Sequence, residues 1–290
     1  MDDITREPRA VEAGRGAAWW GGGWTIFASN VFTWIGIVLI YYIISLVLGL
    51  IPIVGSVGQA LLTPVFLGGI MLGCRSIERD GTLRVAHLFE GFQGAHFVPL
   101  MIIGAVNIAF FIALALLGVA GAFGTFGFAS LMTPGLDPFD ALQGSMRAMT
   151  GLGLLMVLVM LVIVAVFAML NWFAPALVAL HGLSGWEAMK QSLVACMRNW
   201  LPFLVYGLIA LAVIIVLGGL VLVASFGLLA SAFAGSDSGV AAMIAFMAIF
   251  GVGLAAAGLV VGPIVFGSTY AGYRDIFAAA DPALANPAYR

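Results

Sequence analysis

The side chains that could carry chemistry in this chain are few, and the histidines are the first to consider. Imidazole and carboxylate groups bind metal ions and transfer protons, and His87 lies three residues before Glu90, with His96 and His181 farther along. Their spacing matches no recognised metal-binding motif. The sequence also contains no phosphate-binding loop, dinucleotide fingerprint or nucleophile elbow. We therefore expect no metal, no cofactor and no enzymatic activity, with the imidazoles serving as polar tips at a membrane surface.

The surroundings of these residues follow from the composition. Of the 290 residues, 63% are hydrophobic and 8% are charged, whereas a soluble domain carries roughly 25% charged residues. Mean hydropathy is +1.17. A surface with so few charges does not stay dissolved in water, so a bilayer is the expected environment. The net charge of −2 provides no basic field for nucleic acid.

Six apolar blocks are long enough to cross about 30 Å of hydrocarbon as helices. Strands of a membrane β-barrel would be short and would alternate in polarity, and these blocks do neither. The predicted fold class is therefore all-α, a polytopic integral membrane helix bundle with six transmembrane helices. The expected spans are 31–53, 56–74, 98–123, 152–180, 201–230 and 240–272.

No acid, base or histidine falls inside these six spans. Ionisable groups within the membrane are the usual sign of proton relays, ion-coupled transport and membrane-embedded hydrolysis. Their absence from the spans argues against all three activities. It supports the expectation that the protein is not an enzyme.

Two asparagines form a candidate intramembrane polar pair. Asn107 in the third span and Asn171 in the fourth both lie roughly 14 Å from the basic side, at 1.5 Å per helical residue, and hence near the midplane. An amide in hydrocarbon needs a partner. One interpretation is a structural hydrogen bond between two helices of the same hairpin. The other is a polar spot that lines a small cavity.

The basic residues predict the orientation of the bundle. Under a six-span arrangement, only Arg147 falls on the side opposite the other lysine and arginine residues. By the positive-inside rule, the basic side and both termini are cytoplasmic. We expect a flexible cytoplasmic N-terminus at 1–16, a single transmembrane domain at 17–276 and a cytoplasmic tail at 277–290. The residues on the basic side are Arg6, Arg9, Arg15, Arg75, Arg79, Arg84, Lys190, Arg198, Arg274 and Arg290.

A sequence motif that occurs twice predicts an internal repeat. TPVFLGGIMLGCRSI at 63–77 and GPIVFGSTYAGYRDI at 262–276 share a proline, two glycines and an arginine in register. FVPLMIIG at 97–104 and WLPFLVYG at 200–207 share a proline and a glycine at the start of a span. We predict three parallel hairpin pseudo-repeats, related by an axis along the membrane normal. APALVALHG at 174–182 fits the pattern less well, and chance similarity of Gly- and Pro-rich segments is the alternative.

Each hairpin is preceded by a segment with one apolar face. In 184–200, Ser184 and Glu187 form a capping box that starts a helix. A weaker stripe precedes the first span, where the glycines of 21–23 disfavour a helix. We expect cytoplasmic interfacial helices that anchor the spans, with partner binding as the alternative. On the opposite side, Asp137 predicts the start of a short helix. The stripes are Trp186, Met189, Leu193, Met197 and Trp200; Val85, Leu88, Phe89 and Phe92; and Trp19, Trp20, Trp24 and Phe27.

Three arginines on the basic side are candidate contacts for anionic lipid. Arg75 and Arg274 each end an even-numbered span, where the last helical turn exposes carbonyl groups and favours a cation. Arg198 precedes the fifth span at a similar depth. A guanidinium at phosphate depth can hold a lipid headgroup with two hydrogen bonds. Orientation by positive charge alone is the alternative.

The run FAPALVALHGLSGWEAMKQSLVACMRNWLPFLVYG, together with CRSIERDGTLRVAHLFEGF, resembles an uncharacterised family of six-span bacterial inner-membrane proteins. That family is distantly similar to YciC-type proteins and to the membrane domain of some glycerophosphodiester phosphodiesterases. The resemblance extends from about residue 15 to residue 276. It implies an inner-membrane location and the six-span layout. It implies no activity, because the family has no catalytic motif to compare.

Three functions from different classes remain open. The first is a non-enzymatic inner-membrane protein that interacts with membrane lipids or partner membrane proteins through its cytoplasmic collar. This collar is formed by the interfacial segments and the arginines of the basic side. The second is a transporter or flippase of a lipid-like or neutral solute, since glycine and proline interrupt the even-numbered spans. The third is an accessory subunit of a larger membrane complex. Solute flux in proteoliposomes tests the second function, and a pull-down in mild detergent tests the third.

Overall fold

The computed structural model describes residues 8–132, 152–232 and 239–278. Within these ranges the chain forms helices and no strand, and six segments are long and apolar enough to cross a membrane. The predicted all-α polytopic bundle is therefore confirmed. The short helix predicted after Asp137 lies outside the described residues. The elements are α1 (Arg15–Ser29), α2 (Val31–Gly49), α3 (Val54–Asp80), η1 (Val85–Phe92), η2 (Gly94–His96), α4 (Phe97–Met132), α6 (Leu152–Trp172), α7 (Ala174–His181), α8 (Gly185–Arg198), α9 (Trp200–Ala232), α10 (Gly239–Tyr273) and η3 (Arg274–Ala278).

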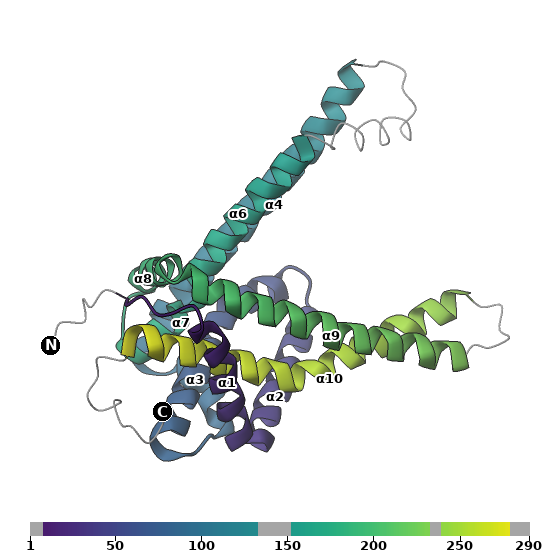
Figure 1. The fold of residues 1–290 in the computed structure, drawn as a ribbon. Coiled ribbons are helices and arrows are strands. Elements are labelled where there is room, and N and C mark those ends of the chain that lie inside the picture. Colours follow the sequence, from purple (N-terminus) through teal and green to yellow (C-terminus); the bar gives the residue numbers. More distant parts are fainter. Residues whose placement is uncertain (1–7, 133–151, 233–238, 279–290) are drawn as a thin grey trace.

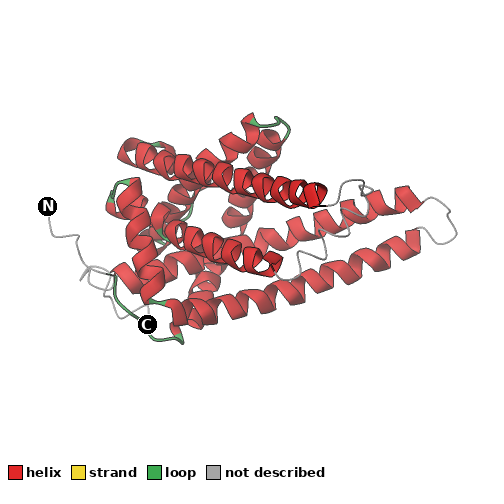
Figure 2. Ribbon diagram, turned by 90° about the horizontal axis from the view of Figure 1, so that it is seen from above, coloured by secondary structure: helices red, strands yellow, loops and turns green. Residues whose placement is uncertain are grey.

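The long helices pair into three hairpins, namely α2 with α3, α4 with α6 and α9 with α10. In Figure 1 the second and third hairpins extend from a common region and diverge from each other. Figure 2 shows the same hairpins from above. We name the common region the basic end, because it carries Arg15, Arg75, Arg198 and Arg274.

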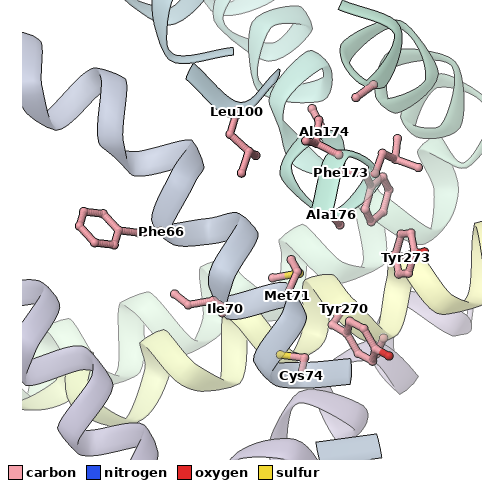
Figure 3. Packing of buried hydrophobic residues seen from close by; sticks show 14 of the residues in the cluster. Phe66, Ile70, Met71, Cys74, Leu100, Phe173, Ala174, Ala176, Tyr270 and Tyr273 are labelled. Carbon is pink, nitrogen blue, oxygen red and sulfur yellow. The ribbon is translucent and has the colours of Figure 1, made fainter. Parts of the chain in front are cut away.

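The buried apolar core lies at the basic end, where α3, α7 and α10 converge (Figure 3). Met71 projects from α3 on the side of α7 and α10, and Tyr270 and Tyr273 project from α10. Phe66 lies on the other side of α3, against Tyr41 and Phe92. The outer parts of the second and third hairpins instead expose leucine, isoleucine and valine. Exposed aliphatic side chains on helices of this length are suited to contact with lipid tails.

The segments between the hairpins join the three repeats into a ring. The segment that precedes each hairpin packs on the second helix of the repeat before it. Thus η1 packs on α3, α8 packs on α6 and α7, and α1 packs on α10. Because α1 begins the first repeat and α10 ends the third, this last contact closes the ring. The repeated motif therefore corresponds to a cyclic arrangement of three units.

Two glycines in the packing segments contact matching positions of the repeated motif. A Cβ atom at Gly91 would lie 2.0 Å from the Val65 carbonyl oxygen, and one at Gly23 would lie 2.2 Å from that of Ile264. Val65 and Ile264 both follow the proline of the motif, so the two contacts are equivalent. Only glycine fits there, because the two backbones approach too closely for any side chain.

In the middle repeat, Ser192 occupies the place of this glycine. Its hydroxyl accepts a hydrogen bond of 2.9 Å from the Phe173 backbone N–H and donates one of 2.6 Å to the Met169 carbonyl. The hydroxyl is thus inserted between two backbone groups that would bond directly in a continuous helix. As a result, α6 ends at Trp172 and α7 begins at Ala174. This break is the physical reason that the middle repeat matches the motif less well.

Helix α1 differs from the surface helix expected from its tryptophans. It continues without interruption through the run of glycines at 21–23. A Cβ atom at Gly22 would meet Ala271 of α10 at 2.9 Å, so this face packs directly on the bundle. Trp19 is 2% exposed, whereas Trp24 is 56% exposed. Only one side of α1 is therefore available to a membrane surface.

Helix α8 has the predicted cap and two distinct faces. The Ser184 hydroxyl accepts a hydrogen bond of 3.4 Å from the Glu187 backbone N–H. Met189, which the sequence placed on a stripe with Trp186 and Trp200, is fully buried in the bundle. Both tryptophans are more than half exposed. The exposed aromatic rings suit the headgroup layer, while the opposite face holds the helix on α6 and α7.

Candidate functional site

The second helices of the three repeats meet at the basic end in a set of polar contacts. The Glu78 carboxylate accepts hydrogen bonds of 2.5 Å from the Tyr270 hydroxyl and from Nη1 of Arg274. Nη1 of Arg75 donates to the Leu180 carbonyl at 3.4 Å, and the Tyr273 hydroxyl shares a hydrogen bond of 2.5 Å with Nε2 of His181. We name this set the polar junction. It consists of Arg75, Glu78, His181, Tyr270, Tyr273 and Arg274.

The polar junction links α3 with α7, α3 with α10, and α7 with α10. Its charged pair, Glu78 and Arg274, is partly buried, with exposed side-chain fractions of 14% and 34%. Two opposite charges in this setting neutralise each other, so neither needs full hydration. The sequence identified Arg274 but gave no reason to select Glu78 as its partner, because the two residues are 196 positions apart.

A second buried carboxylate, Asp275, fixes α1 to the end of the third repeat. Its two oxygens accept hydrogen bonds of 2.7 and 2.6 Å from the Arg15 guanidinium. The Trp19 indole N–H donates to the same carboxylate at 2.9 Å. Asp275 is 7% exposed, and these charge-assisted bonds satisfy both of its oxygens. Sequence reasoning missed this residue, although it directly follows the arginine of the repeated motif.

Asn199, which lies between α8 and α9, forms hydrogen bonds with the segment that precedes α1. Its Oδ1 accepts a hydrogen bond of 2.8 Å from the Val11 backbone N–H, and its Nδ2 donates to the Arg9 carbonyl at 3.0 Å. Nη1 of the neighbouring Arg198 donates to the Pro8 carbonyl at 2.7 Å. The segment before α1 is therefore ordered by side-chain contacts with the third repeat.

The sequence predicted that the histidines serve as polar tips at a membrane surface, and for His87 this prediction is wrong. Nδ1 of His87 accepts a hydrogen bond of 2.9 Å from the Arg84 backbone N–H, and its Nε2 lies 3.5 Å from the Glu90 carboxylate. The His87 side chain is 3% exposed, so it caps η1 as part of the packed core. Within the described ranges, no cluster of three or more metal-ligating side chains occurs.

A cavity lies between the first hairpin and the second, among α2, α3, α4 and α6. Its volume is about 990 Å³. The lining is mostly apolar, and the described residues that form it include no acid, base or histidine. We name it the membrane cavity. Its polar lining residues are Ser45, Ser56, Gln59, Thr63, Asn107 and Asn171.

A smaller cavity of about 250 Å³ continues the membrane cavity toward the centre of the ring. The two share lining residues, among them Leu67 of α3 and Asn171 of α6. The smaller cavity also contacts Phe266 of α10. Leu67 and Phe266 occupy equivalent positions of the repeated motif and are apolar, whereas Asn171 adds an amide to the lining. The smaller cavity is lined by Leu67, Met71, Ala168, Asn171, Trp172, Pro175, Ala176, Val265, Phe266 and Thr269.

The structure places both asparagines of the predicted polar pair in the wall of the membrane cavity. Nδ2 of Asn171 donates to the Phe167 carbonyl within its own helix at 3.0 Å. Oδ1 of Asn107 is buried and has no hydrogen-bond partner among the described residues. The two amides therefore do not satisfy each other. A buried carbonyl oxygen without a donor costs about 1–3 kcal/mol, which makes Asn107 the least satisfied polar group of this wall.

Gln59 is a polar lining residue that sequence reasoning missed. Its amide nitrogen donates to the Tyr41 hydroxyl and to the Ser45 hydroxyl, each at 3.1 Å. The Thr63 hydroxyl donates to the Gln59 backbone carbonyl at 2.7 Å. These hydrogen bonds lie within the first hairpin. None of them reaches the Asn107 amide on the facing wall of the cavity. A glutamine inside a predicted span was the available signal.

The three arginines proposed for lipid contact all have protein partners. Arg274 is bound to Glu78, Arg75 donates to the Leu180 carbonyl, and Arg198 donates to the Pro8 carbonyl. Their guanidinium groups are thus positioned by the protein itself. Contact with anionic lipid stays a prediction, because a guanidinium has further N–H donors beyond those used here.

The chain is similar to a probable inner membrane protein of Burkholderia thailandensis. The two sequences are 28% identical over 280 residues, which cover 94% of this chain and 94% of the relative. No family model matches the chain, and no solved structure matches it. The relative and the six apolar helical segments together support a multi-pass membrane protein.

Proposed function

We propose that this protein is a non-enzymatic, multi-pass protein of the bacterial inner membrane that binds a lipid-like molecule in the membrane cavity. The observation that carries the proposal is the cavity itself, with about 990 Å³ of space between two hairpins. Ligand sites are mostly apolar clefts with a few convergent polar groups, and this lining has that composition. The similar protein of Burkholderia thailandensis supports the inner-membrane location.

The orientation belongs to the same proposal. The basic end faces the cytoplasm, as the distribution of lysine and arginine indicates. The membrane cavity then lies at the depth of the hydrocarbon, beyond the polar junction. The distant similarity to YciC-type proteins and to the membrane domain of glycerophosphodiester phosphodiesterases stays a prediction, and the proposal does not depend on it.

A cavity-filling variant tests lipid binding. Ala115 of α4 lines the membrane cavity, whereas Ala113 of the same helix does not. We expect Ala115→Trp to lose the lipid-like molecules that the purified protein retains, because the indole occupies their space. Ala113→Trp is the matched control and should retain them. Mass spectrometry of the extracted lipids gives the measurement, and equal retention by the two variants would contradict the proposal.

Binding through a cytoplasmic collar is a separate part of the proposal. Arg75 and Arg274 keep one positive charge each when changed to lysine, but they lose the planar fork that holds a phosphate. If the collar binds anionic lipid, the double variant Arg75→Lys with Arg274→Lys should retain less phosphatidylglycerol in native mass spectrometry. Unchanged retention would leave these arginines with a structural and orienting role only.

Transport is the second candidate function, and the position of the polar junction favours it. Met71 and Thr269 line the smaller cavity, and Glu78 and Tyr270 of the junction lie just beyond them on the same helices. Separation of α3 from α10 would therefore connect the cavity with the basic end. Flux of a fluorescent neutral lipid in proteoliposomes tests this function. Protein-dependent flux that increases in Glu78→Gln supports transport, and no flux above that of empty vesicles excludes it for this lipid.

An accessory role in a larger complex stays a prediction. The exposed faces of α9 and α10 carry aliphatic side chains suited to either lipid or another membrane protein. A pull-down in mild detergent, followed by mass spectrometry, tests whether a partner membrane protein is retained in a constant ratio. Recovery of the chain alone would leave membrane lipids as its partners.

A further inference from the structure

We infer that the ligand of the membrane cavity is an uncharged amphiphile whose small polar group donates a hydrogen bond, such as a diacylglycerol or a long-chain alcohol. This inference rests on the proposed function and adds the chemical class of the ligand. It follows from the charge of the lining, from the one polar group that lacks a partner and from the size of the space.

The charge of the lining excludes an ionised headgroup inside the cavity. Among the described residues, neither cavity is lined by an acid, a base or a histidine. Glu78 and Arg274, which belong to the same helices farther toward the basic end, are already paired with each other in the polar junction. A phosphate or ammonium group in the cavity would have no counter-ion, and burial of an uncompensated charge is strongly unfavourable. The part of the ligand that lies inside the cavity therefore carries no charge.

The hydrogen bonds of the lining define what the ligand must supply. The Gln59 amide nitrogen is used by Tyr41 and Ser45, and the Asn171 amide nitrogen is used by the Phe167 carbonyl. The side-chain amide of Asn107 has no hydrogen-bond partner among the described residues, neither a donor to Oδ1 nor an acceptor for Nδ2. A ligand hydroxyl can donate to such an amide and accept from it. The unmatched amide therefore suits a ligand that carries a hydroxyl group.

The size and shape of the lining favour one amphiphile. About 990 Å³ is at the upper end of the range for sites that hold a single small molecule. Apart from its few polar groups, the wall is formed by apolar residues such as Phe111, Ile112 and Val57. These side chains suit hydrocarbon chains. Of the polar groups, the Gln59 amide nitrogen and the Thr63 hydroxyl already have protein partners, so a ligand with many hydroxyl groups, such as a free sugar, would find few partners.

A pair of photoreactive lipids with identical acyl chains tests the inference. One probe is a diacylglycerol with a diazirine in its acyl chain, and the other is the corresponding phosphatidic acid, which differs only by its phosphate. Each is added to the protein in phosphatidylcholine nanodiscs, with excess unlabelled diacylglycerol as competitor. We expect competed labelling of peptides from α4 and α6 by the diacylglycerol probe and not by the phosphatidic acid probe.

Three variants connect the labelling with Asn107. Asn107→Leu should weaken competed labelling by about three- to tenfold, which corresponds to about 0.7–1.4 kcal/mol and hence to the loss of one hydrogen bond. Asn107→Ser keeps an acceptor and should restore part of it. Ala210→Leu changes the equivalent position of the third repeat and should have no effect. Equal loss in Asn107→Leu and Ala210→Leu would contradict a specific role for the amide.

The outcomes separate this inference from the proposed function. If both probes give equal competed labelling, the cavity binds lipid but does not select an uncharged ligand, and the inference is wrong while the proposed function stands. If neither probe is competed, or if Ala115→Trp labels as strongly as the wild type, the lipid contacts are those of bulk membrane. That result would overturn both.

Discussion

The buried carboxylate of Asp275 is a single residue on which the contact of α1 with the bundle depends. Its oxygens accept hydrogen bonds from Arg15 and from the Trp19 indole. The contact joins residues more than 250 positions apart in the sequence. Neither a short motif nor a helical periodicity marks such a pair, so it could not be predicted from the sequence.

We predict that Asp275→Asn lowers the thermal stability of the protein in detergent. The amide removes the charge that the Arg15 guanidinium binds and presents a donor where an acceptor is required. Loss of these bonds should cost about 1–3 kcal/mol. Arg15→Gln and the double variant complete a thermodynamic cycle. Additive effects of the two single changes would show that Asp275 and Arg15 do not act as a pair.

A second prediction concerns the thiol of Cys196 in α8. Burial raises the pKa of this thiol to about 12, so it stays protonated throughout the range from pH 7 to 9. Because the thiolate is the reactive form and stays a very small fraction of this thiol, maleimide should label the folded protein slowly at every pH in this range. Cys196 is measured in a Cys74→Ala background. An exposed cysteine introduced as Ser29→Cys, in a variant without either native cysteine, should react much faster at each pH. Labelling of Cys196 at the rate of that control would contradict its burial.

At the scale of helices, the length and apolar character of the six spans were enough to predict them, because each depends on local composition. The position of α1 was not predictable in the same way. Its run of glycines lowers intrinsic helix propensity, and only contact with Ile264 and Ala271 of α10 explains why the helix continues. The break at Ser192 was likewise hidden, because a serine on a predicted amphipathic helix gives no sign that it enters a neighbouring helix.

The glycines of α1 allow a matched pair of substitutions. Gly23→Ala places a Cβ atom 2.2 Å from the Ile264 carbonyl oxygen and should lower thermal stability, because both backbones must separate. Gly21→Ala meets nothing within 4 Å and should raise stability by about 0.5–1 kcal/mol through helix propensity. Unfolding temperatures in the same detergent provide the comparison. A decrease of equal size in both variants would show that α1 does not pack on α10 as described.

At the scale of the whole molecule, the repeat was predictable in outline because the proline, glycine and arginine positions recur in register. The cyclic contact between the repeats was not, since it depends on which segment packs on which helix. The same holds for the candidate site. Asn107 and Asn171 were identified by their depth, but the cavity that they line depends on how the first and second hairpins pack, which no local pattern records.

The orientation of the whole protein leads to a prediction that fusion reporters can test. If the basic end is cytoplasmic, alkaline phosphatase fused after Arg290 should be inactive, because the enzyme folds only outside the cytoplasm. The same reporter inserted near Gly135 should be active. A green fluorescent protein fusion at each site serves as the complementary control, with fluorescence expected only after Arg290. The reverse pattern would overturn the proposed orientation.

The packing of α1 on α10 has a consequence for biogenesis. Helix α1 leaves the ribosome first, yet its partners Ile264 and Asp275 are synthesised more than two hundred residues later. At a rate of about 5–20 residues per second, α1 waits on the order of ten seconds or more before the ring can close. During that interval its glycine face and the Arg15 side chain have no native partner. A chain that stops before the sixth span therefore keeps the α1 surface that packs on Ile264, Ala271 and Asp275 without its native partner.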